Sequence, residues 1–195
     1  MEFFQTIWTA LTTPNEGLIK IILFCISFID ALVNMLLFTT ILNINTSKFK
    51  RILYVFLIAI IGFTSRAFIP NPYATFLNLL TAFLFIKFIL KTTILKSIIG
   101  VFISLLVSVV MELFLFKFYL TIFKIAYESV MYIPIYRLLF TLSIYLCIYF
   151  LYRIVKYCKF NINLENMTKR NRILFVFTTI LGILAIGTQL YLISF

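Results

Sequence analysis

The sequence has 195 residues, of which 64% are hydrophobic and 12% are charged, with a formal net charge of +11 and a mean hydropathy of +1.14. A soluble domain of this length carries roughly 25% charged residues, so the chain has too few polar groups to cover a water-exposed surface. The composition excludes a water-soluble domain and predicts an integral membrane protein.

The first 17 residues contain Trp8 and Pro14 and are too short and too polar to form a span, so residues 1–17 are predicted to form an interfacial N-terminal helix. A membrane-spanning helix needs about 20 mostly apolar residues. The fold class expected for residues 18–195 is therefore all-α, a polytopic bundle of six transmembrane helices. The six predicted spans are Leu18–Leu42, Ile52–Ile69, Ala74–Leu90, Ser97–Phe123, Pro134–Val155 and Ile173–Ser194.

The stretch "FIPNPY" separates the second predicted span from the third. Proline fixes φ and pushes the preceding residue out of the α region, so Ile69 and Asn71 are both expected to be extended. The sequence predicts a rigid turn around Asn71, which either presents a fixed shape to a ligand or only connects two helices.

The distribution of basic residues predicts the orientation. One set of connections holds twelve Lys and Arg residues and the opposite set holds five. The positive-inside rule places the larger set in the cytoplasm and the N-terminus outside, and after six spans Phe195 is outside as well. The twelve are Lys48, Lys50, Arg51, Lys87, Lys91, Lys96, Arg153, Lys156, Lys159, Lys169, Arg170 and Arg172, and the five are Lys20, Arg66, Lys117, Lys124 and Arg137.

Three polar stripes are predicted to line the inner seams of the bundle. A charge at membrane depth is costly and usually faces protein or water, so Asp30 and Glu112 are candidate functional residues. Either they pair with Arg66, Arg137 or Lys117 and fix the helix register, or they line an outward-open cavity and contact a ligand. The stripes are Ser27–Asp30–Asn34, Ser104–Ser108–Glu112 and Gly182–Ala185–Gln189.

The sequence offers no set of catalytic residues. It contains no histidine, which excludes a Ser-His-Asp triad, a Cys-His protease pair, a histidine phosphoacceptor and a His-ligated metal. It also has no glycine-rich phosphate loop, and the spacing of Cys25, Cys147 and Cys158 matches no metal motif. We therefore expect no enzymatic activity from this chain, no bound cofactor and no metal.

Three segments, "FIPNPYATFLNLLTAFLFIKFILKTTILKSII", "MELFLFKFYLTIFKIAYESVMYIPIYRLLF" and "RNRILFVFTTILGILAIGTQLYLISF", resemble the membrane sensor half of clostridial Agr-type sensor histidine kinases, which carry a C-terminal GHKL ATPase domain. The resemblance covers residues 50–195 in order. It implies a multi-pass receptor in the plasma membrane of a Gram-positive bacterium, which detects a secreted peptide in quorum sensing and signals to a response regulator in a two-component system.

The chain departs from this family because it ends at Phe195, before any phosphoacceptor histidine or nucleotide-binding domain. A kinase domain is cytoplasmic, whereas Phe195 is predicted to be outside. We therefore expect a fragment or an interrupted gene, with a seventh span preceding the kinase half.

Within the receptor interpretation, the outer half of the bundle is the expected sensing surface. It comprises the Pro-Asn-Pro turn, the loop "KIAYESVMYIP" over residues 124–134, and the acidic residues beneath them. The expected partners are membrane lipids, an extracellular peptide or small apolar ligand, and no nucleic acid; a homodimer is also compatible with this interpretation. The candidate ligand-binding residues are Asp30, Arg66, Asn71, Glu112, Tyr127, Tyr132 and Arg137.

Two other classes remain open. The substrate-capture subunit of energy-coupling-factor vitamin transporters has a similar architecture and would retain bound vitamin. A scaffold subunit of the cell-wall elongation machinery would co-purify with its partners and bind no small ligand. The Agr-type peptidase is excluded because it resembles a Cys-His enzyme and this chain has no histidine.

The predicted orientation can be checked by labelling cysteines from outside intact cells. The variant Asn71→Cys is expected to react with a membrane-impermeant thiol reagent and Asn161→Cys is expected to stay protected, because the charge bias puts them on opposite sides. Labelling of the second position alone would invert the orientation.

Overall fold

The computed structural model describes residues 2–125, 127–160 and 162 of the chain. All regular secondary structure in these residues is helical, and no strand occurs among them. Four of the helices are long and apolar enough to cross a membrane, so the chain is a multi-pass membrane protein. These four are α2 (Glu16–Ile41), α3 (Lys48–Phe68), α5 (Ile94–Ile122) and α7 (Pro134–Tyr157).

These four helices confirm the first, second, fourth and fifth predicted spans to within a few residues. The third predicted span forms α4 (Asn71–Phe88), but its apolar part, Tyr73–Phe88, is shorter than the other four. The sixth predicted span, Ile173–Ser194, lies outside the described residues. The predicted N-terminal segment forms α1 (Glu2–Thr12), and the predicted loop over residues 124–134 contains a short helix, α6 (Tyr127–Tyr132).

The helix ends follow local chemistry. Asn15 caps α2 by accepting a hydrogen bond from the Leu18 amide at 3.0 Å, and Thr93 caps α5 by accepting one from the Lys96 amide at 3.4 Å. Ile69 is extended at φ −119° and ψ 138°, as expected for a residue before proline. The prediction that Asn71 is also extended was wrong, because Asn71 begins α4. Proline is tolerated in a first turn, whose amides have no partner within the helix.

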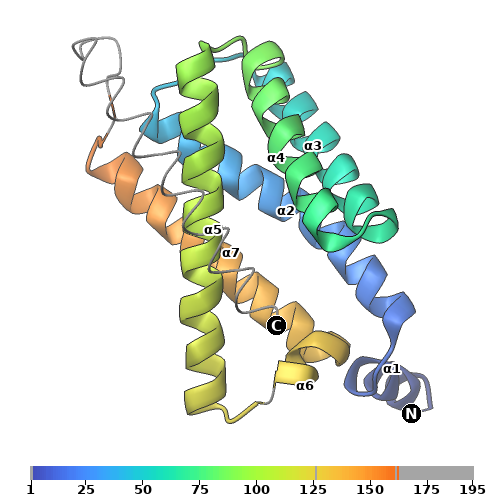
Figure 1. Cartoon of the computed structure of the whole chain (residues 1–195). Helices are drawn as coiled ribbons and strands as arrows, with labels where there is room; N and C mark the ends of the chain where they lie inside the picture. The colour runs from blue at the N-terminus through green and yellow to red at the C-terminus, as the bar shows by residue number, and fades with distance from the viewer. Residues whose placement is uncertain (1, 126, 161, 163–195) are drawn as a thin grey trace.

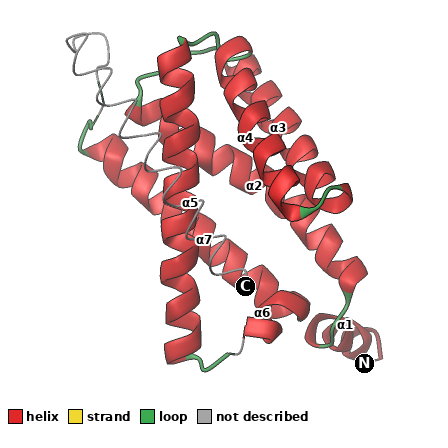
Figure 2. Ribbon diagram, viewed as in Figure 1, coloured by secondary structure: helices red, strands yellow, loops and turns green. Residues whose placement is uncertain are grey.

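The long helices alternate in direction along the bundle (Figure 1). The helices α3 and α4 lie side by side as a hairpin, and α2 crosses α7 beside the upright α5 (Figure 2). The ends of α2 and α4 and the starts of α3 and α5 meet at the upper end in Figure 1. The connections at this end carry the basic residues that predict a cytoplasmic location.

Two hydrophobic clusters meet at α2. On one side Phe38 and Leu42 of α2 pack with Tyr54 of α3 and with α4 and α5. On the other side Leu37 packs with Phe140 of α7 and with α5 and α6. Phe38 and Leu37 are both fully buried. Since α2 contributes to both clusters, it is the central helix of the described bundle.

The helix α5 approaches α2 and α4 closely at Gly100. A Cβ atom added to Gly100 of α5 would lie 3.2 Å from Cδ1 of Ile86 and 3.3 Å from Cδ2 of Phe38. The absence of a side chain at this position therefore sets the distance between three helices. Gly62 of α3, by contrast, would place an added Cβ in open space.

We expect Gly100→Leu to destabilise the protein by about 1–3 kcal/mol, because a larger side chain in a filled core forces the neighbouring helices apart. The measurement is the thermal unfolding midpoint of the purified chain in detergent. The matched control is Gly62→Leu, which changes the helix propensity by the same amount. A Cβ atom added at Gly62 has no neighbouring atom within 4 Å. Equal losses in the two variants would contradict the packing argument.

Candidate ligand-binding cavity

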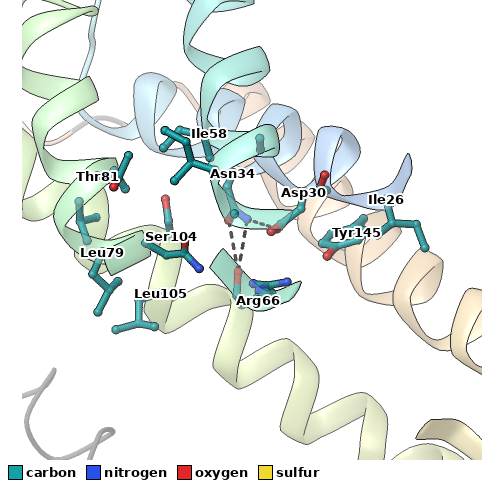
Figure 3. Close-up of a pocket in the computed structure, with 18 of the residues that line it drawn as sticks. Ile26, Asp30, Asn34, Ile58, Arg66, Leu79, Thr81, Ser104, Leu105 and Tyr145 are labelled. Atoms are coloured by element: carbon teal, nitrogen blue, oxygen red, sulfur yellow. Dashed lines mark hydrogen bonds between the residues drawn. The ribbon is translucent and has the colours of Figure 1, made fainter. Parts of the chain in front are cut away.

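A cavity of about 270 Å³, here called the central cavity, lies among α2, α3, α4, α5 and α7 (Figure 3). Its wall combines apolar side chains with an unusual number of polar ones for a membrane-embedded bundle. The polar and charged residues that line it are Ser27, Asp30, Asn34, Tyr54, Arg66, Asn78, Thr81, Ser104, Ser108, Glu112, Arg137, Thr141 and Tyr145.

Two of the three predicted polar stripes line this cavity. The whole Ser27–Asp30–Asn34 stripe of α2 and the whole Ser104–Ser108–Glu112 stripe of α5 contribute to its wall. Their spacing places each stripe on one helix face, and burial of the flanking apolar residues turns that face inward. The third stripe, Gly182–Ala185–Gln189, lies outside the described residues.

A hydrogen-bonded link between α2 and α5 runs through the cavity wall. The Asn34 amide donates to the Asp30 carboxylate at 2.6 Å, and the Asn34 amide nitrogen lies 3.4 Å from the Ser108 hydroxyl (Figure 3). A charged acceptor makes the first of these bonds the stronger one. Asp30 is therefore held in a defined position, and its second carboxylate oxygen accepts no hydrogen bond from any residue that the structure describes.

Electrostatic interactions connect Asp30 and Tyr145 to other charged residues of the cavity. Asp30 interacts electrostatically with Arg66 and with Glu112, and Tyr145 interacts with both acids and both arginines. Arg66 forms no hydrogen bond or ion pair with any residue that the structure describes. The geometry in this part of the chain thus places Asp30 and Arg66 around a shared space rather than in a closed pair.

A second cavity of about 300 Å³, here called the outer cavity, adjoins the first. The two share Leu23, Ser27 and Arg66 in their walls. The outer cavity lies at the end of the bundle where α2 begins and α3 ends, which the charge bias predicts to be extracellular. Its remaining wall is formed by Glu16, Ile19, Lys20, Phe63, Ala67 and Tyr132.

The structure brings most of the predicted site residues together. Four of them, Asp30, Arg66, Glu112 and Arg137, line the central cavity, and Tyr132 lines the outer cavity. Asn71 and Tyr127 begin α4 and α6, but their side chains lie outside what the structure describes. Pro70, the one residue of the Pro-Asn-Pro turn whose side chain the structure describes, lines neither cavity.

Sequence reasoning missed five polar residues of the wall: Tyr54, Asn78, Thr81, Thr141 and Tyr145. A signal for two of them was present. Thr141 and Tyr145 follow Arg137 at spacings of four and eight residues. Spacings close to whole numbers of turns place these residues on the same face as a charge that has to point inward.

No family model matches the sequence, and comparisons with curated proteins and with solved structures gave no match.

We expect Ser108→Cys to react with a small, charged, membrane-impermeant thiol reagent. The polar wall of the central cavity favours a water-filled space, and the outer cavity connects this space to the end of the bundle. The three native cysteines are first replaced by alanine. The matched control is Val110→Cys, which lies at nearly the same depth of α5 with 51% of the valine exposed on the lipid side. Protection of both positions would contradict a water-accessible cavity.

Proposed function

We propose that the chain is a membrane sensor module, which binds an extracellular ligand in the central cavity and signals by a change in the packing of its helices. The observation that carries this proposal is one cavity lined by two acids and two arginines from four helices of the bundle. Charged groups at membrane depth cost several kcal/mol unless protein or water solvates them, and they commonly mark a ligand or ion site.

The arrangement of the wall supports signalling by helix packing. Five helices contribute side chains to the cavity, and the hydrogen-bonded link through Asn34 joins α2 to α5 across it. A ligand that touches all of these helices has different affinities for different packings and therefore shifts their populations. The helix α2 would pass this shift on, because it belongs to both hydrophobic clusters.

The same proposal includes the topology and the partner domain of the sensor. It comprises six spans, a plasma-membrane location with the N-terminus outside, and a cytoplasmic kinase half supplied beyond this chain. The resemblance to Agr-type sensors supports it, as does the grouping of basic residues at one end of the bundle. The outer cavity at the opposite end is consistent with a signal that arrives from outside.

A substrate-capture subunit of a vitamin transporter is the second candidate, and the same cavity favours it. A scaffold protein that binds no small ligand does not need charged side chains that line a cavity. The cavity therefore favours a sensor or a capture subunit over a scaffold protein. The two ligand-binding classes differ in outcome, because a sensor couples the cavity to a kinase, whereas a capture subunit passes its ligand to a transporter.

To test the sensor proposal, we would join the chain through one added span to the kinase half of an Agr-type relative and measure autophosphorylation in membrane vesicles. Asp30→Asn and Glu112→Gln are each expected to change the basal rate by about fivefold or more, the size of a typical coupling free energy. Both substitutions keep side-chain size and remove a charge from the cavity.

The control in this test is Val110→Leu, a lipid-facing change in the same helix as Glu112. Basal rates that match the parent in both acidic variants would show that the cavity is not coupled to the kinase, and the sensor proposal would be wrong.

A further inference from the structure

We infer that the central cavity binds a small zwitterion of the size of a free amino acid, with its ammonium group near Asp30 and Glu112 and its carboxylate near Arg66 and Arg137. This inference rests on the proposed function, since it names the chemical class of the ligand for the same cavity. It departs from the expectation of a small apolar ligand.

The first argument is charge balance. Among the residues that the structure describes, the wall holds two carboxylates and two guanidinium groups, whose ordinary charges sum to zero. A ligand with one net charge would leave an unbalanced charge between membrane helices, which is costly. An apolar ligand would displace water from Asp30 and Arg66 without replacing its hydrogen bonds. A zwitterion avoids both costs.

The second argument is that the four charged side chains line the same cavity as the Tyr145 phenol. The Tyr145 side chain lies within electrostatic range of all four charged residues, and Asp30 lies within range of both Arg66 and Glu112. A phenol group both donates and accepts hydrogen bonds, so Tyr145 suits either end of a zwitterion. Arginine presents paired donors that match the geometry of a carboxylate.

The third argument is size. The cavity, at about 270 Å³, lies at or below the lower end of the roughly 300–1,000 Å³ that is usual for ligand pockets. This volume suits one amino acid rather than a long peptide.

The access route supports the same assignment. The outer cavity shares Arg66 with the central one, and its wall holds one acid and one base, Glu16 and Lys20. A zwitterion that enters from the outer end would therefore meet charges of both signs before it reaches Arg66, whose side chain borders both spaces.

The test uses the whole purified chain in lipid nanodiscs. Each of the fifteen standard amino acids with an uncharged side chain is titrated alongside its amide, which carries only the positive charge, and its N-acetyl derivative, which carries only the negative charge. Binding is measured by isothermal calorimetry. At least one amino acid is expected to bind tenfold or more tightly than both of its derivatives. If no amino acid binds, or if a derivative binds as tightly, the inference is wrong.

Charge variants give a second readout that a purely structural role would not produce. Asp30→Asn and Arg66→Gln are each expected to weaken binding of the amino acid at least tenfold. They should also change its charge preference in opposite directions, with Asp30→Asn shifting preference toward the N-acetyl derivative and Arg66→Gln toward the amide. Lys48→Gln, an exposed residue at the other end of α3, should leave both unchanged.

If Arg66→Gln does not purify in folded form, Arg66→Lys serves in its place, because lysine keeps the charge but loses the paired donors. It should weaken amino-acid binding while retaining the charge preference of the parent, and a reversed preference would contradict the assignment. A kinase fusion that responds to the cavity variants while no amino acid binds would leave the sensor proposal intact and overturn only the ligand class. Failure of both measurements would overturn both.

Discussion

The central position of α2 is the constraint on which the rest of the described structure depends. This helix carries Asp30 near its middle, hydrogen-bonded to Asn34 at 2.6 Å. Lipid cannot solvate a carboxylate, so α2 has to be enclosed by other helices on the face that bears it. The bundle meets this requirement by packing α3 and α4 on one side of α2 and α7 on the other, with α5 across from Asn34.

Small residues at successive positions of α5 have different effects on its packing. Gly100 allows α5 to approach Phe38 and Ile86 closely. Farther along the helix, Ser104 and Ser108 line the central cavity, where their small side chains leave space for water or a ligand. Close packing next to a cavity suits a module in which occupancy of the cavity changes helix packing.

In the proposed mechanism, the outer cavity makes the first contact with the ligand and the central cavity retains it. The outer cavity lies where α2 begins and offers one charge of each sign, which suits first contact with a ligand. The central cavity holds the charges that would determine which ligand remains bound. Arg66 borders both, because it lies in the last turn of α3, where the two cavities adjoin. This residue therefore connects access to binding in the proposed mechanism.

The membrane class, four spans and the two polar stripes of α2 and α5 can be predicted from the amino-acid sequence, because hydropathy and helical periodicity are local properties. The meeting of Asp30, Arg66, Glu112 and Arg137 around one space depends on the fold, since their separation along the chain carries no information about helix neighbours. The fold likewise adds Asn78 and Thr81 to the wall, and their inward orientation depends on how the α3–α4 hairpin rotates against α2. Local chemistry fixes which faces are polar, whereas the packing of all the helices together fixes which of these faces meet.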